Sequence, residues 1–154
     1  MDTTDSEIAP MVADRTPVHL WIVGVLALLW TGFGGFDYLM TMTNNEAYLA
    51  QFTEAQRDYF QSFPGWVMAA WAFGVWGGVA GSILLLLRSR HAVTAFAISL
   101  AGLAASSAYQ YLLDDTDLSA IMPENMQYMV WAIWIVAILL LVYAWRQRRS
   151  GVLR

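Results

Sequence analysis

The chain contains no cysteine and no lysine, and only 13% of its 154 residues are charged. Without cysteine it cannot form disulfides, thiolate metal sites or a cysteine nucleophile. Its two histidines, His19 and His91, are expected at the polar ends of apolar stretches. Haem and copper sites in membranes need several histidines inside the bundle, so no cofactor is expected. Phosphate loops, zinc motifs and nucleophile elbows are absent as well.

Apolar sequence is abundant instead, at 58% of all residues. Four long apolar stretches lie at about 18–42, 65–87, 92–113 and 126–145. Each has about the 20 residues that a helix needs to cross a hydrocarbon layer about 30 Å thick. Segments 83–87 and 138–142 lack the polar face of a helix in a soluble bundle. We therefore predict an all-α polytopic membrane protein, with a four-helix transmembrane domain at 18–145 in the lipid bilayer.

The basic residues are all arginine, and their placement predicts the topology. Seven of the eight fall on one side if both termini share it: Arg15, Arg88, Arg90, Arg146, Arg148, Arg149 and Arg154. The positive-inside rule makes that side cytoplasmic. We expect a flexible acidic tail at 1–17 and a basic cytoplasmic tail at 146–154. So short a tail gives no reason to expect nucleic acid as a partner.

The first connection has structure of its own. Thr53 to Gln56 form a capping-box pattern, which predicts a short helix that Pro64 ends. Several aromatic residues give this segment an apolar side too large to leave in water. One or two short amphipathic helices lying at the outer membrane interface are the simpler interpretation. A lid over a binding site is the alternative.

Small residues mark expected contacts between spans. The second span carries Gly74, Gly77, Gly78 and Gly81, and the third answers with Gly102 and Ser106. In lipid, helix association depends on close backbone approach, which small residues permit. Residues 88–91 alone join these spans, so we expect the two spans to pack as an antiparallel hairpin. The small residues should mark tight contact within this hairpin or with a partner subunit. Gly34 in the first span is a further candidate for close packing. The fourth span has no glycine and should face lipid most widely.

Asp37 is the one ionisable side chain expected inside a span, and membrane carboxylates suggest function by default. Trp30, Gly34 and Asp37 recur at helical spacing on one stripe, with Thr41 beyond them. The third span carries Tyr109 and Gln110 at a depth similar to that of Asp37. Either side chain could donate a hydrogen bond to the carboxylate.

Two interpretations of these residues stay open. Aromatic rings with a carboxylate and an amide can hold a sugar, since rings stack on C–H faces while polar groups bind hydroxyls. The candidate binding residues are Asp37, Tyr38, Trp30, Trp76, Tyr109 and Gln110. The other interpretation is a hydrogen-bonded clamp between helices with no ligand.

Four strings carry a family resemblance. They run over 30–41, 63–66, 74–77 and 84–90, and the similarity extends from Thr16 to the C-terminus. Together they resemble a group of small four-span inner-membrane proteins of proteobacteria, often labelled sugar transporters. The resemblance implies transport of a sugar-like solute, with Asp37, Tyr38 and Trp76 as the positions to test.

Two functions remain as expectations. One is a small-solute transporter, which needs an oligomer because four spans are too few to enclose an alternating-access path. The other is a non-catalytic accessory or assembly subunit of a larger membrane complex, which explains the packing glycines without a substrate. An intramembrane enzyme has only Asp37 in its favour, so no catalytic activity is expected.

Overall fold

A computed structural model describes residues 16–154, so most of the predicted acidic tail lies outside the described residues. The long helices are α1 (Val18–Met42), α4 (Gly65–Leu86), α5 (Ala92–Ala108) and α7 (Glu124–Arg149). A π-helical turn, η1 (Tyr109–Leu113), continues α5. The short helices are α2 (Glu46–Leu49), α3 (Glu54–Gln61) and α6 (Leu118–Ile121).

The four long helices, with η1 counted as part of α5, are long and apolar enough to cross a membrane. The described chain has no strand, so the all-α prediction is confirmed. Helix α1 has the predicted bounds, and α4 ends one residue early at Leu86. Helix α7 extends beyond the predicted 126–145 at both ends and reaches Arg149. Its most apolar window is 11% buried against 22% for each other span, which confirms its wide outward exposure.

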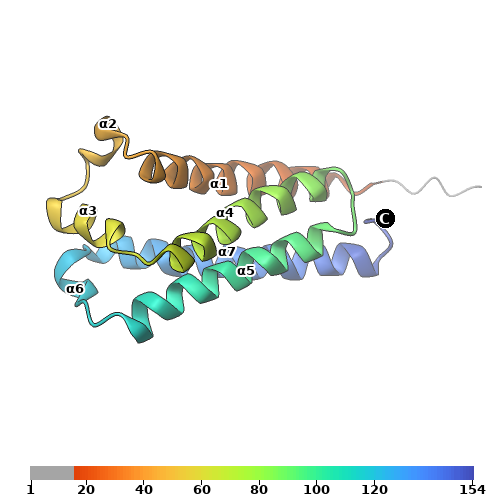
Figure 1. The fold of residues 1–154 in the computed structure, drawn as a ribbon. Helices are drawn as coiled ribbons and strands as arrows, with labels where there is room; N and C mark the ends of the chain where they lie inside the picture. The colour runs from red at the N-terminus through yellow and green to blue at the C-terminus, as the bar shows by residue number, and fades with distance from the viewer. Residues whose placement is uncertain (1–15) are drawn as a thin grey trace, which may run out of the picture.

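The bundle is an antiparallel row of helices in the order α1, α4, α5, α7 (Figure 1). Helix α4 packs most extensively on α5, α1 covers α4, and α7 covers α5. Helices α1 and α7 do not pack along their length in the described chain. We call the end that carries Arg88, Arg90 and the last turn of α7 the arginine end. The opposite end, with α2, α3 and α6, is the acidic end (Figure 1).

Glycines bring α4 and α5 into backbone contact, as their spacing predicted. A Cβ atom on Gly102 would lie 2.5 Å from the carbonyl oxygen of Ala70, and one on Gly77 would lie 2.9 Å from the Ser99 amide nitrogen. Gly74 faces the same stretch of α5, and the Ser99 hydroxyl donates to the Gly74 carbonyl oxygen. The prediction of close packing in this hairpin is confirmed.

The other residues predicted to pack closely differ in whether they have a neighbour. A Cβ on Gly81 would meet the Phe96 ring at 2.7 Å, and one on Gly78 would meet Thr31 of α1 at 3.0 Å. Ser106 is buried. The prediction was wrong for Gly34, because no atom lies within 4 Å of its Cβ position. Its neighbour Gly35 points toward Trp76 instead, at 3.8 Å, since adjacent helical residues face different directions.

The arginine end holds a tightly packed apolar core. Its buried members come from every long helix and from the chain's last residues: Leu20, Ala27, Leu85, Ala92, Phe96, Leu140, Ala144 and Leu153. The segment after α7 folds back, and Arg154 makes backbone hydrogen bonds of 2.8 Å to Arg88 and to Arg90. The predicted basic tail is therefore ordered. Its first residues continue α7, where the helix dipole favours arginine.

The acidic end is capped by the connections. Helix α3 begins with the predicted capping box at Thr53, but it ends at Gln61, and Pro64 instead precedes α4. The Gln56 amide nitrogen donates to the carbonyl oxygen of Ile121 at 3.1 Å, which ties the two connections together. Phe63 links α3 to the end of the third span, since its ring centroid lies 5.0 Å from that of Tyr59 and 5.8 Å from that of Tyr109.

We predict that Gly102→Ala lowers the stability of the bundle, because its methyl group has to displace backbone atoms of α4. Overpacking of this kind costs about 1–3 kcal/mol. Gly32→Ala is the matched control, because its Cβ position is open and alanine favours the helix by about 1 kcal/mol. Thermal unfolding in detergent measures both variants. Equal midpoints for Gly102→Ala and the unmodified protein contradict the packing described here.

Candidate functional site

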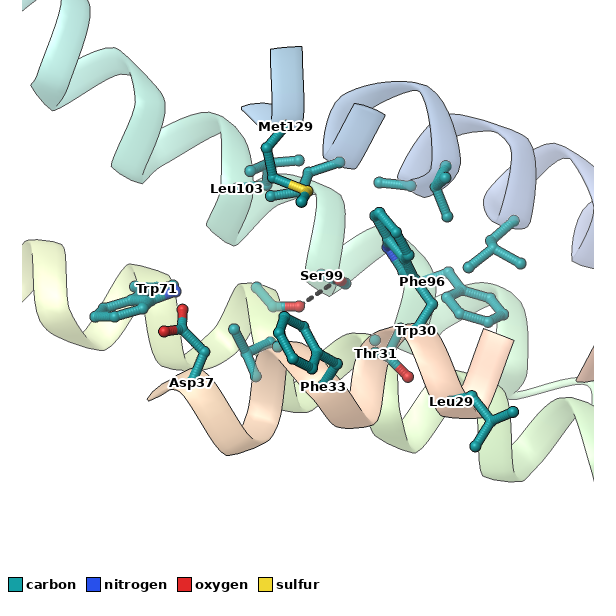
Figure 2. A pocket seen from close by; sticks show the side chains of 18 of the residues that line it. Leu29, Trp30, Thr31, Phe33, Asp37, Trp71, Phe96, Ser99, Leu103 and Met129 are labelled. Carbon is teal, nitrogen blue, oxygen red and sulfur yellow. Dashed lines mark hydrogen bonds between the residues drawn. The ribbon is translucent and has the colours of Figure 1, made fainter. Parts of the chain in front are cut away.

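A cavity of about 600 Å³ lies where α1 and α7 fail to meet. We call it the side cavity. Helix α1 contributes Leu26, Leu29, Trp30, Phe33 and Asp37, and α7 contributes Met129, Ile133, Val136 and Leu140. Its floor is formed by the packed faces of α4 and α5 (Figure 2). Phe33 is 67% exposed and Met129 48%, so the cavity opens sideways on the surface of the bundle.

The hydroxyl groups of the cavity wall already have partners in the protein. Thr31 donates to the Ala27 carbonyl oxygen at 2.8 Å, and its oxygen lies 3.2 Å from the hydroxyl of Ser82. The hydroxyls of Ser99 and Ser106 donate to backbone carbonyls. These bonds satisfy side chains that would otherwise be costly in an apolar setting. The wall is therefore apolar in effect over most of its length.

Asp37 is the charged exception, and it lies at the acidic end of the cavity with Trp71 (Figure 2). The Tyr48 hydroxyl on α2 donates to Asp37 Oδ1 at 2.5 Å. The ring of Tyr48 makes edge-on contacts with the rings of Phe36 and Phe52. The turn that brings α2 back over α1 passes through Asn44, which has a φ of 50°. Burial, the hydrogen bond to Asp37 and the carboxylate charge all raise the pKa of Tyr48.

The structure divides the six predicted binding residues among three places. Trp30 and Asp37 line the side cavity, as their shared stripe on α1 predicted. Tyr38 lies instead at the α1–α4 contact, with its ring centroid 5.0 Å from that of Trp71 and 6.5 Å from that of Trp76. The expected single cluster does not form.

Neither of the two candidate donors to Asp37 is hydrogen-bonded to it among the described residues. Gln110 donates to the Ser106 carbonyl oxygen within its own helix, at 3.3 Å. Tyr109 packs edge-on against Trp66, with ring centroids 5.6 Å apart. Both residues belong to the π-helical turn η1, and their contacts lie with α5 and α4. Tyr48, in the connection, takes the place proposed for them.

Sequence reasoning missed the contributions of α4 and α7 to the cavity. Trp71, Gly74, Val75 and Gly78 recur at helical spacing, so their common face could have been found. On α7 the lining residues are indistinguishable in type from their lipid-facing neighbours. Nothing in the sequence of that span marks the cavity side.

No cluster of three or more histidine, aspartate or glutamate side chains suited to a metal occurs among residues 16–154. His19 is tied to α7, since its Nδ1 lies 2.6 Å from the hydroxyl of Tyr143. Asp114 and Asp117 at the acidic end are engaged in local turns. Hydrogen bonds from Thr116 and Ser119 lower the pKa of these two carboxyl groups respectively.

We predict that Tyr48 in the folded protein ionises at a higher pH than free tyrosine, whose pKa is about 10. The folded state favours the protonated phenol of Tyr48. Its contribution to the free energy of unfolding is therefore present below pH 10 and is lost as the pH rises through the raised pKa. Ultraviolet absorbance of the phenolate follows the titration.

Tyr48→Phe should reduce by one the number of tyrosines that ionise at a higher pH than free tyrosine. Asp37→Asn should lower the pKa of Tyr48 toward that of free tyrosine, because it removes the negative charge while the burial of Tyr48 remains. If Tyr48→Phe leaves the number of these tyrosines unchanged, the hydrogen bond between Asp37 and Tyr48 is excluded.

Comparisons with known proteins identify no relative of this chain. No family model, no curated protein and no solved structure matches it. The four long apolar helices and the side cavity are therefore the observations on which a function has to rest.

Proposed function

We propose that this integral membrane protein binds a small, largely apolar solute in the side cavity and carries it within the bilayer. The observation that carries the proposal is the cavity itself. Its volume of about 600 Å³ lies within the range of about 300–1,000 Å³ for small-molecule sites. Its exposed rim, with Phe33 and Met129, gives a solute dissolved in lipid direct access.

The cavity wall supports an apolar solute better than the sugar expected from the resemblance. A sugar brings many hydroxyl groups, and each needs a hydrogen-bond partner when it leaves water. The hydroxyls of Thr31, Ser99 and Ser106 already donate to carbonyl groups of the backbone. The polar group best placed to serve a ligand is Asp37, which suits one polar group and not a ring of them.

An accessory role in a larger membrane complex, or in an oligomer of this chain, is the second candidate. Its support is the exposure of α7, where Trp131 is 68% exposed and Leu139 61%. A partner helix could cover this face and fill the rim of the cavity. Both roles use the same bundle, and solute binding distinguishes them.

Filling the cavity tests the proposed function. We predict that Ala137→Trp, on the cavity wall, weakens binding of a long-chain methyl ester at least tenfold, because the indole occupies the space of the solute. Leu139→Trp on the outer face of the same helix is the matched control and should bind normally. Native mass spectrometry of the protein released from detergent counts bound ester.

Movement of a fluorescent form of the ester between the leaflets of proteoliposomes measures the carrier step. The unmodified protein and Leu139→Trp should accelerate it, and Ala137→Trp should not. Absence of a bound ester in the unmodified protein overturns the proposal and leaves the accessory role. Equal binding by both variants places the solute elsewhere.

We also propose that the protein lies in the bacterial inner membrane with its arginine end in the cytoplasm. The absence of cysteine makes single-cysteine labelling straightforward. In intact cells, a membrane-impermeant maleimide should label Asp115→Cys and should spare Ser150→Cys until the membrane is opened. Both residues are exposed, so labelling reports the side of the membrane. The reverse pattern contradicts this topology.

A further inference from the structure

We propose that the side cavity selects an amphiphile with one hydrogen-bond-donating head, an amine or a hydroxyl, which Asp37 binds at the acidic end. This inference rests on the proposed function, because it specifies the solute of the same cavity. It follows from where polar groups occur along the cavity and from what they can still bind.

The cavity is polar at one end and apolar at the other. Asp37 and Trp71 lie at its acidic end, and Phe96 and Leu29 lie toward the arginine end (Figure 2). An elongated molecule that enters between α1 and α7 therefore places its chain along the apolar wall. Its head can reach the carboxylate at the level of the leaflet on the acidic side.

The carboxylate has unused capacity to accept hydrogen bonds. Tyr48 donates to Oδ1, and no residue among 16–154 donates to Oδ2. A carboxylate offers about four lone-pair sites, so a single donor leaves most of them free. In an apolar setting an unmet acceptor is costly, so a ligand that supplies a donor gains free energy.

Charge determines which heads fit. No arginine of the described chain lines the cavity, so an anionic head such as a phosphate or a carboxylate finds no counter-charge there. Asp37 repels such a head. An ammonium group is favoured most, because a hydrogen bond to a charged group is stronger than one between neutral groups.

Tyr48 competes with the ligand for the same carboxylate. Its hydroxyl comes from α2, outside the span, and occupies Oδ1 at the end of the cavity where the head is placed. A head that approaches Asp37 shares the carboxylate with Tyr48 or displaces it. Removal of the Tyr48 hydroxyl should therefore strengthen binding of a donor head and leave a head without a donor unchanged.

The test uses four probes with one alkyl chain and different heads: a primary amine, an alcohol, a methyl ester and a carboxylate. In the unmodified protein the amine should bind about tenfold or more tightly than the ester, as expected for a charge-assisted hydrogen bond. The alcohol should lie between them, and the carboxylate should bind most weakly. Native mass spectrometry with competition between probes gives the ratios.

Two variants and a control assign the effect to Asp37. Asp37→Asn should remove the advantage of the amine over the ester, while Asp114→Asn, a carboxylate outside the cavity, should keep it. Tyr48→Phe should raise amine affinity by a factor of about 2–10, the worth of one hydrogen bond. Since this variant keeps the cavity wall, it remains informative if Asp37→Asn fails to fold.

The outcomes separate the two proposals. Equal binding of all four heads to the unmodified protein overturns the selection by Asp37 and leaves the apolar carrier intact. An advantage for the amine that survives Asp37→Asn also overturns it. Failure of every probe, the ester included, overturns the carrier function itself.

Discussion

The whole bundle depends on how closely α4 and α5 approach each other. In lipid there is no hydrophobic force between apolar helices, so association relies on contact and on interhelical hydrogen bonds. Gly74, Gly77 and Gly102 provide the contact, and Ser99 donates a hydrogen bond across it. This pair forms a rigid centre on which α1 and α7 pack from separate sides. Because both outer helices pack on the centre and meet each other at the arginine end, a space remains between them toward the acidic end.

The fold was largely predictable because its signals are coarse and physical. A run of about 20 apolar residues needs a membrane or a core, and glycines at intervals of three and four need a close neighbour. The capping box at Thr53 is a local pattern, and it appears where expected. Errors arose where the backbone departs from the regular helix. Tyr109 and Gln110 lie in a π-helical turn, and no pattern in the sequence predicts that turn.

The candidate site was predictable only in part, for a different reason. The stripe of Trp30 and Asp37 on α1 is a property of one helix, and it was found. A cavity between two helices depends on their separation, which no single helix encodes. The residues of α7 that line it resemble those that face lipid, since both environments are apolar. The tyrosine that binds Asp37 lies in a connection, and its position depends on a turn at Asn44 with positive φ.

The tie between His19 and Tyr143 has a mechanical consequence. It joins the outer helices at the arginine end, where Leu20, Ala144 and Leu153 also fill the interior. At the acidic end the two helices are linked indirectly, through the hydrogen bond from Gln56 to Ile121 that joins the two connections. Helix α7 has the smallest buried share of the four spans, and local opening costs less free energy where fewer contacts are buried. Any widening of the gap between α1 and α7 should therefore be greater beside Asp37 than at the arginine end.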